Sequence, residues 1–360
     1  MKKYIVVGLI VLVGGFLLLK PLFGNGTVKV KSDPVTFTFK ENLAVKLYDK
    51  TSLEFEVKEK VASVEILFNS DVIGSWDSPE GVLMCNLDAG KYGIGAKRLV
   101  LKSTGLDGTV YKDERMVRVL SDVIPEEFNI IISSKYPHKT ESFTQGLEFY
   151  KGKLYEGTGD PGSTGSTLVA EVDVNSGEHK QKMGLQAGYF GEGITIINNV
   201  LYQITWKNGK CYKYDVNSDL SLLGEYSYAG EGWGLCNDGK SLIMSDGTER
   251  IAFRNPETFE IERTLEVSNH QGPIGYLNEL EYVDGKIYAN VWTTSMIISI
   301  DPQSGKVLEQ IDATDFVNLA RGKGEVLNGI AFNNVTNQFF LTGKYWDKLY
   351  AVKFIESNLP

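Results

Sequence analysis

The sequence predicts an all-β protein in which a five-bladed β-propeller follows an immunoglobulin-like β-sandwich. Two observations lead to this prediction: five similar segments recur beyond Pro125, and short strands of alternating polarity fill most of the chain before it. With 360 residues and a hydrophobic fraction of 42%, the chain is long and apolar enough for two packed domains. We expect an N-terminal targeting segment at 1–24, the sandwich at 25–122 and the propeller at 123–360.

The N-terminal segment has the pattern of an export signal. Lys2 and Lys3 precede an apolar run from Tyr4 to Leu19. The length of this run lies between that of a signal-peptide core and that of a full membrane span, and no small-residue cleavage motif follows. An uncleaved anchor fits better than a cleaved signal, and both remain open. Either way the rest of the chain is expected outside the cytoplasm, periplasmic or extracytoplasmic, touching a membrane only through this segment.

The region from Val28 to about Leu120 reads as some seven short strands separated by turn residues. Polar and apolar side chains alternate in segments such as Val35–Phe39, Leu53–Val57 and Val64–Phe68. This number of strands in so few residues is typical of an immunoglobulin-like sandwich. The region contains no chemical constellation, so we expect a spacer or docking module.

The propeller prediction rests on an internal repeat. Each of five segments begins with a polar or aromatic residue, usually followed by glycine and an aliphatic residue, and then a strand, a tight turn and a second strand. These segments begin at Gln145, Glu192, Trp233, Asn278 and Asn328, which lie 41 to 50 residues apart. That period is typical of a four-stranded propeller blade. Because the last segment lacks one strand, Phe128–Ile132 is expected to complete its blade and close the ring.

Equivalent positions of the blades should meet at one mouth of the central channel. The first residues of the repeats would then form a ring there, and the second strands would bring further residues back to the same mouth. Those returning segments are Thr158–Asp160, Thr205–Trp206, Ser245–Asp246, Val291–Trp292 and Gly343–Lys344. The predicted pocket thus combines an acid, Glu192, a cation, Lys344, several amides and three tryptophans. Aromatic walls with a few convergent polar groups are typical of a site for a small molecule or a peptide end.

The same residues resemble a known family. Phe143–Leu147, Phe190–Ile194, Glu231–Leu235, Leu277–Tyr282, Tyr288–Trp292, Val326–Ile330 and Thr342–Trp346 resemble the signature segments of glutaminyl-peptide cyclotransferases of the plant and bacterial type. The resemblance covers roughly residues 126–356 and leaves out the predicted sandwich. It implies a zinc-independent acyltransferase that closes the N-terminal glutamine of peptides or proteins into pyroglutamate.

The chemistry of that reaction assigns a role to each candidate residue. Glu192 is the expected proton shuttle, and Lys344, Asn278 and Gln145 are the expected groups that polarise the amide. The substrate would be held by the remaining candidates. These are Phe143, Phe190, Trp206, Trp233, Trp292 and Asn328.

Two other functions stay open at this point. A non-catalytic propeller could bind a ligand or a protein at its face. A metal-dependent hydrolase of the lactonase kind would need several carboxylates or histidines at the axis, where only Glu192, Asp160 and Asp246 are available. We predict no cofactor, and no ligands for a structural Ca²⁺ can be placed from the sequence.

Composition excludes further classes. The net charge of −9 and the lack of a Lys/Arg-rich run argue against a nucleic-acid partner. Three histidines and three cysteines without metal-ligand spacing argue against a zinc site. Cys211 and Cys236 could pair, but buried thiols fit better.

Overall fold

A computed structural model describes residues 33–39 and 41–357. Within these ranges the protein is all-β, apart from the 3₁₀ helix η1 (Gly90–Tyr92) and the α-helix α1 (Thr314–Ala320). The apolar segment predicted to be a signal or anchor lies outside the described residues. No helix within them is long and apolar enough to cross a membrane.

The first region, up to Leu120, consists of two sheets. One contains β1 (Val35–Phe37), β3 (Thr51–Val57) and β6 (Gly81–Leu87), in the order β1-β3-β6. The other has the order β2-β8-β7-β4-β5, with β2 (Leu43–Lys46), β8 (Val110–Leu120), β7 (Gly95–Gly105), β4 (Val61–Phe68) and β5 (Asp71–Asp77). Both sheets contribute to one apolar core, which includes Leu53, Phe55, Ile66 and Phe68.

Alternating polarity explains how these strands form. In β3 the side chains of Leu53 and Phe55 are fully buried, whereas those of Glu54 and Glu56 are exposed. Because successive side chains of a strand point to opposite faces, this alternation gives the sheet one apolar and one solvated face.

The second region begins with three antiparallel sheets of four strands each, in chain order. The first contains β10 (Thr144–Tyr150), β11 (Lys153–Thr158), β12 (Leu168–Val172) and β13 (His179–Gly184). The second contains β14 (Gly191–Ile197), β15 (Val200–Thr205), β16 (Lys210–Asp215) and β17 (Ser221–Ser227). The third contains β18 (Leu235–Asn237), β19 (Leu242–Ser245), β20 (Arg250–Arg254) and β21 (Ile261–Glu266).

The remaining strands form an eight-stranded sheet made of two four-stranded halves. One half contains β22 (Leu277–Val283), β23 (Lys286–Val291), β24 (Met296–Ile300) and β25 (Val307–Asp312). The other contains β26 (Leu327–Asn333), β27 (Gln338–Gly343), β28 (Lys348–Glu356) and β9 (Glu126–Pro137). The prediction that Phe128–Ile132 completes the last unit is confirmed, because β9 pairs antiparallel with β28. The parallel pairing of β9 with β25, which joins the two halves, was not predicted.

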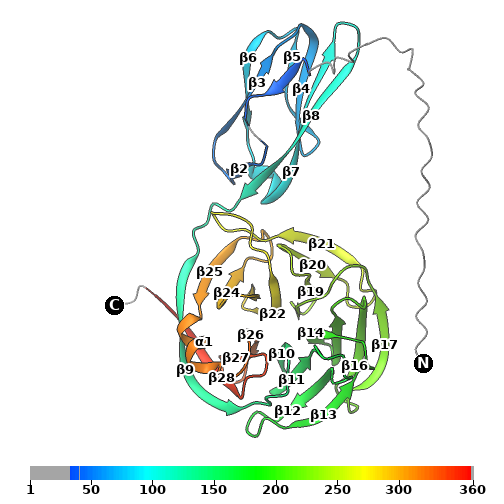
Figure 1. The fold of residues 1–360 in the computed structure, drawn as a ribbon, viewed down its shortest axis with the longest axis vertical. Coiled ribbons are helices and arrows are strands. Elements are labelled where there is room, and N and C mark those ends of the chain that lie inside the picture. The colour runs from blue at the N-terminus through cyan, green and yellow to red at the C-terminus, as the bar shows by residue number, and fades with distance from the viewer. Residues whose placement is uncertain (1–32, 40, 358–360) are drawn as a thin grey trace, which may run out of the picture. The chain divides into compact units, whose positions relative to one another are not determined.

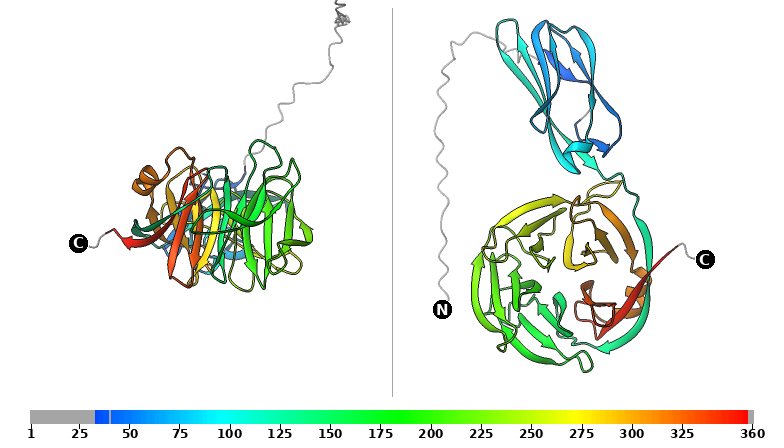
Figure 2. Two further views of the ribbon diagram at one scale, coloured as in Figure 1. Left: turned by 90° about the horizontal axis from the view of Figure 1, so that it is seen from below. Right: turned by 180° about the vertical axis from the view of Figure 1, so that it is seen from behind.

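The first strands of the five units lie around a common centre (Figure 1). Each contacts the next, in the cyclic order β10, β14, β18, β22, β26 and back to β10. The last strand, β28, lies beside β9 and completes the ring, as the view from behind in Figure 2 shows. Burial decreases outward, since every residue of β14 is buried whereas burial alternates along the outer strand β13. The innermost strands are therefore covered on both faces.

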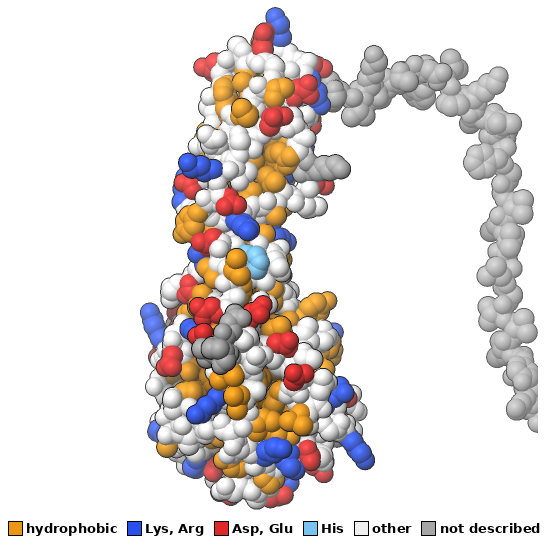
Figure 3. Space-filling model, turned by 90° about the vertical axis from the view of Figure 1, so that its left-hand side faces the viewer, with side chains coloured by type: hydrophobic (Ala, Val, Ile, Leu, Met, Phe, Trp, Pro, Cys, Tyr) orange, Lys and Arg blue, Asp and Glu red, His pale blue; other side chains and the backbone are white. Residues whose placement is uncertain are grey.

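The tight turns between the first two strands of the units agree with the sequence. Lys151 and Gly152 have φ values of 51° and 77°, and Asp284 and Gly285 have values of 48° and 80°. Glycine and Asp or Asn tolerate this left-handed region well, which is why they indicate hairpin turns. On the face shown in Figure 3, acidic and basic side chains are interspersed, without a continuous basic patch.

Candidate active site

A recurring irregularity positions the first residue of each repeat. The pairing of the first two strands shifts register between Thr144 and Gly146, and equivalent shifts occur around Glu192, Asn278 and Asn328. Such β-bulges release a residue from the regular ladder and turn its side chain in a new direction. The bulges thus direct four repeat-leading side chains away from the sheets at the same end of the inner strands.

Close backbone approach explains the glycine that follows most of these residues. A Cβ atom at Gly234 would collide with the carbonyl of Asn278 in the next unit. At Gly193 it would collide with the backbone of Gly234 and Leu235, and the Gly193 N–H donates to the Trp233 carbonyl over 2.8 Å. Glycine lets the inner strands approach each other closely enough for their leading side chains to share one pocket.

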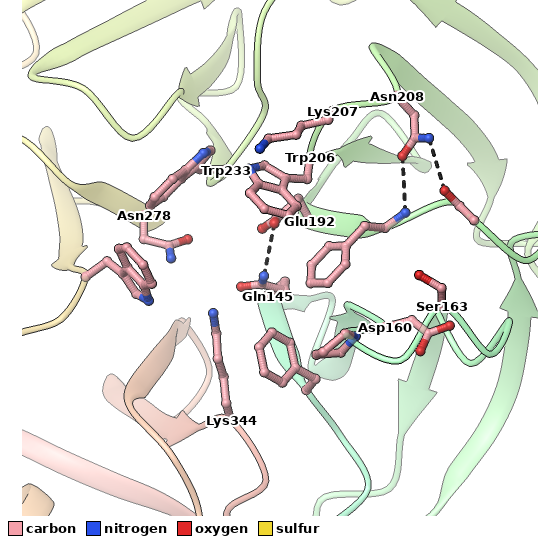
Figure 4. A pocket seen from close by; sticks show the side chains of 15 residues that line it. Gln145, Asp160, Ser163, Glu192, Trp206, Lys207, Asn208, Trp233, Asn278 and Lys344 are labelled. Atoms are coloured by element: carbon pink, nitrogen blue, oxygen red, sulfur yellow. Dashed lines mark hydrogen bonds between the residues drawn. The ribbon is translucent and has the colours of Figure 1, made fainter. Parts of the chain in front are cut away.

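Four of the five repeat-leading side chains, all except that of Asn328, line a cavity of about 590 Å³ at the ring centre (Figure 4). The volume suits a dipeptide-sized or drug-sized ligand. Nine of the ten residues predicted from the sequence line it: Phe143, Gln145, Phe190, Glu192, Trp206, Trp233, Asn278, Trp292 and Lys344.

The tenth predicted residue, Asn328, does not line the cavity and is fully buried behind Gln145. Its Nδ2 donates to the Thr144 carbonyl over 2.9 Å and to Gln145 Oε1 over 3.0 Å. The amide nitrogen of Asn328 thus bonds within the protein, its Oδ1 has no partner among the described residues, and its predicted contact with a substrate stays a prediction. With its oxygen held in this way, Gln145 directs its Nε2 toward Glu192 Oε1 at 3.0 Å.

Glu192 has a buried carboxyl group whose two oxygens differ in their hydrogen bonding. Its side chain is 4% exposed, and Oε2 has no hydrogen-bond partner among the described residues. Burial raises the pKa of Glu192 well above its usual value, the charge of Lys344 opposes this shift, and the charge of Glu231 adds to it. A perturbed carboxyl group in a concave pocket is a candidate for proton transfer.

Lys344 is the buried cation of the pocket. It is 4% exposed, and its Nζ lies 4.4 Å from the centre of the Phe143 ring. Burial lowers the pKa of Lys344, and the nearby carboxyl of Glu192 counteracts that effect. Figure 4 shows its amine pointing into the cavity, on the side of Gln145 and Asn278. An ammonium group in this position can stabilise negative charge that develops on a bound molecule.

The aromatic side chains form two connected walls. In the first, the ring centroids of Phe143 and Phe190 are 5.9 Å apart, and those of Phe190 and Trp206 are 5.6 Å apart. In the second, Trp233 and Trp292 meet edge to face at 5.4 Å. These edge-to-face contacts are favourable arrangements of aromatic pairs, and the rings give the pocket apolar walls.

Part of the pocket rim was not predicted. Ser163, Lys207 and Asn208 line it without having been predicted, whereas Asp160 was expected at this mouth of the channel but was given only a possible metal-binding role. Asp160 Oδ2 accepts the N–H groups of Gly165 and Ser166, so this carboxylate organises its own loop. The Pro-Gly-Ser sequence after Asp160 signals a turn, but no sequence pattern places that turn over the pocket.

The structure offers no cluster of metal ligands in the described residues, since no three His, Cys, Asp or Glu side chains lie together so as to hold an ion. Asp246, the third carboxylate considered for a metal, lines a different cavity of about 380 Å³. The three cysteines are buried free thiols, so Cys211 and Cys236 are not paired.

The fold and this pocket define a class: an all-β ring whose central aromatic cavity contains a buried carboxyl and a buried amine. The chain belongs to the glutamine cyclotransferase family, whose sequence model matches residues 107–354.

Two known proteins illustrate the relationship. The chain is 34% identical over 238 residues to a glutaminyl-peptide cyclotransferase of Arabidopsis thaliana, an alignment that covers 64% of this chain and 72% of the relative. It also resembles the crystal structure of the Myxococcus xanthus glutaminyl cyclase, with a TM-score of 0.61 and 32% identity. That match covers 65% of this chain and 100% of the other.

Proposed function

We propose that this protein is a glutaminyl-peptide cyclotransferase, which converts the N-terminal glutamine of peptides or proteins into pyroglutamate and releases ammonia. One observation is central: inside an aromatic pocket of dipeptide size, Glu192 keeps one carboxyl oxygen unpartnered in a chain of the glutamine cyclotransferase family. A non-catalytic binding propeller, the alternative from the sequence, gives no reason to bury such a group at the pocket centre.

The reaction requires one proton to change places. The α-amine of glutamine attacks the carbonyl carbon of its own side-chain amide, so a C–N bond forms and the amine loses a proton. The tetrahedral intermediate then breaks the bond to the amide nitrogen, which takes up a proton and leaves as ammonia. A single carboxyl group can accept the first proton and deliver the second.

Glu192 suits this shuttle. A carboxyl group with a raised pKa is closer in proton affinity to an amine than an exposed one is, which favours transfer in both directions. The bond from Gln145 Nε2 fixes one oxygen and leaves the other for the substrate. In this proposal Gln145 orients Glu192 rather than polarising the amide itself.

Lys344 and Asn278 are the proposed partners of the developing oxyanion. Both point into the cavity near Gln145, and Lys344 is almost fully buried (Figure 4). In a pocket shielded from water, a fixed cation or amide donor stabilises negative charge more strongly than it does in solvent. Asn278 Oδ1 has no partner among the described residues, so the side chain also offers an acceptor for the substrate amine.

The aromatic walls would hold the glutamine in a folded conformation. Phe143, Phe190, Trp206, Trp233 and Trp292 surround the polar groups. Keeping the amine and the amide carbon in attack geometry removes much of the entropic part of the barrier.

The test is ammonia release from a Gln-initiated dipeptide, followed together with the loss of one ammonia mass from the peptide. An N-acetylated Gln peptide serves as the control, because its blocked amine cannot attack. Since the proposal needs no metal, a chelator should leave the rate unchanged. If the wild-type protein binds the dipeptide without releasing ammonia, the binding-protein alternative is correct. Loss of activity with the chelator would contradict the metal-free mechanism.

We further propose that the ring is a five-bladed β-propeller and that the preceding sheets form an immunoglobulin-like domain outside the catalytic unit. The cyclic contacts of the inner strands support the first assignment, and the shared core of the three- and five-stranded sheets supports the second. The residues of the pocket all come from the ring.

Export is proposed from the sequence of the first 24 residues. With Lys2 and Lys3 on the cytoplasmic side, the ring would lie outside the cytoplasm. Protease added to spheroplasts should then digest it. Protection of the ring until lysis would contradict this topology.

A further inference from the structure

An acidic side chain outside the pocket lining connects two of the pocket's tryptophans. Glu231 lies between β17 and β18. Its Oε2 accepts hydrogen bonds from Trp206 Nε1 at 2.8 Å and from Trp233 Nε1 at 3.0 Å. One carboxylate oxygen therefore receives the only N–H group of each indole ring. Bonds of this charge-assisted kind are stronger than those between neutral groups.

The two tryptophans belong to different units of the ring. Trp206 follows β15 in the second sheet, and Trp233 precedes β18 in the third. Their backbones are held separately, because Trp206 N–H donates to the Phe190 carbonyl and Trp233 N–H donates to the Ser245 carbonyl. These backbone hydrogen bonds fix the position of the main chain at each tryptophan, but they do not constrain the side-chain torsion angles. The shared carboxylate constrains the direction of both rings.

From this geometry we infer that Glu231 is a positioning residue, which sets the orientation of Trp206 and Trp233 toward each other across the boundary between two units of the ring. The inference rests on the proposed function only for its kinetic consequence. The structural part concerns the two indoles and holds for any ligand that the pocket takes.

Lys207 holds the carboxylate itself in place. Its Nζ lies 3.5 Å from Glu231 Oε1, the oxygen that the indoles do not use, and 3.9 Å from the centre of the Trp206 ring. Both oxygens of Glu231 are thus engaged, and Trp206 is contacted by the lysine on its face and by the glutamate at its edge. This arrangement limits rotation of the carboxylate, although its side chain remains 39% exposed.

Glu231 also adds negative charge near the proposed proton shuttle. Burial alone would raise the pKa of Glu231, but hydrogen bonds from Trp233 and Trp206 and the charge of Lys207 hold it below its usual value. The carboxylate is therefore ionised at neutral pH and acts on Glu192 in the opposite sense to Lys344.

Three other charged side chains near Glu231 do not line the aromatic pocket. With Glu231 they line the separate 380 Å³ cavity: Asp246, Arg250 and Arg254. Two roles of Glu231 can thus be distinguished by experiment, since one depends on its hydrogen bonds and the other on its charge.

Glu231→Ala removes the acceptor and the charge, whereas Glu231→Gln keeps a side-chain oxygen of the same reach and removes only the charge. Glu225→Ala is the matched control, because that glutamate also pairs with a lysine, Lys210, whereas the tryptophan hydrogen bonds go to Glu231. Each variant is made in the full chain, labelled with 5-fluorotryptophan. The fluorine resonances of the five tryptophans are assigned by single Trp→Phe substitutions.

In Glu231→Ala, the resonances of Trp206 and Trp233 should shift or broaden, while those of Trp76 and Trp346 keep their positions. The KM for a Gln-initiated dipeptide should rise about ten- to a hundredfold, with kcat changing less than about threefold, because two charge-assisted bonds that order the binding wall are lost. Glu225→Ala should reproduce the wild-type spectrum and KM.

The Glu231→Gln variant separates charge from hydrogen bonding. Its two indole resonances should stay closer to the wild-type positions than those of the alanine variant. The limb of the kcat/KM profile that Glu192 controls should move to lower pH, because a neighbouring negative charge has been removed. A purely structural role of Glu231 would leave this limb in place.

Unchanged Trp206 and Trp233 resonances in Glu231→Ala would overturn the positioning role. So would an unchanged KM in a folded, active variant. If the wild-type protein releases no ammonia from Gln peptides, the proposed function fails. The fluorine spectra, recorded without substrate, still decide whether Glu231 orients the two rings.

Discussion

The two β-regions of this protein bury very different side chains. In the described residues up to Leu120, the core consists of apolar groups such as Phe55 and Phe68, and Ser103 is the buried polar side chain. The ring between β9 and β28 buries many more polar side chains, among them several carboxyls. Those carboxyls are Glu148, Glu156, Asp160, Glu171, Glu192, Glu279, Glu281 and Glu309. Secondary structure alone therefore does not determine what a β-domain can keep in its interior.

The buried carboxyls of the ring also differ among themselves. Glu279 is fully buried, and its two oxygens accept the N–H groups of Leu147 and Ile330, which lie on strands of two other units. Glu192 has one oxygen bound and one unpartnered. Because an unsatisfied buried polar atom is unfavourable, satisfied groups such as Glu279 serve the architecture. Glu192, whose second oxygen has no partner among the described residues, is the exception, and this is the reason to propose a catalytic role for it.

The largest expected effect tests that exception directly. Glu192→Gln should lower kcat by about 10²–10⁴-fold, because the proposed shuttle can no longer exchange a proton. KM should change little, since the substitution preserves size and leaves the aromatic walls in place. Steady-state kinetics on a Gln-initiated dipeptide measures both values. Near-normal turnover would show that the proton is transferred elsewhere.

A core substitution in the region up to Leu120 should affect stability and not catalysis. Phe55 is fully buried, so Phe55→Ala should reduce the free energy of unfolding of that region by about 3–5 kcal/mol. Denaturant unfolding measures the loss. The kcat of the folded variant should equal that of the wild type, and a large drop in kcat would contradict the division between the two regions.

Lys344→Ala tests the charge opposite Glu192. Loss of one oxyanion donor should lower kcat by about 10²–10³-fold. Lys348→Ala is a suitable control, because Lys348 is a half-exposed lysine outside the pocket that pairs with Asp347. If Lys344→Ala raises KM alone, the lysine binds the ground state and does not stabilise the intermediate.

The smallest expected effect, when it is measured per pH unit, concerns a buried carboxyl group. Burial raises the pKa of Glu148 to about 8, against 4.5 for the ordinary group. The unfolded chain therefore releases this proton at lower pH than the folded chain does, and the contribution to stability falls as pH rises from about 4.5 to about 8. The slope is at most about 1.4 kcal/mol per pH unit. Glu148→Gln should flatten it in unfolding curves recorded across this range. An unchanged slope would assign the pH dependence to other groups.

Much of the ring and its pocket could be predicted because both depend on a repeat. Glu192 and Trp233 are the first residues of their repeats and so occupy equivalent places in two units. Their convergence at one pocket follows from the periodicity. Asn328 has the same place, yet its amide nitrogen bonds within the protein and its side chain does not line the cavity, so repeat position alone does not identify a lining side chain.

Interactions between units were harder to predict. Glu231 lies only two residues before Trp233, but its bond to Trp206 depends on how neighbouring sheets meet. The same holds for buried His138, whose Nε2 lies 3.0 Å from Glu156 and whose Nδ1 lies 2.8 Å from the Trp346 carbonyl. Both ring nitrogens thus face oxygen atoms, and the charge of Glu156 raises the pKa of His138 despite burial. No local sequence pattern encodes such a contact.

The pairing of β9 with β28 has a consequence for how the ring is made. β9 is synthesised before every other strand of the ring, and its partner β28 is synthesised last. During translation the edge of β9 must therefore remain without that partner while the intervening strands emerge. Pairing over so long a stretch of chain is slow, since closing a long loop precedes the contacts that stabilise it. The closed ring is thus expected to be the final product of folding, reached only after β28 has emerged from the ribosome.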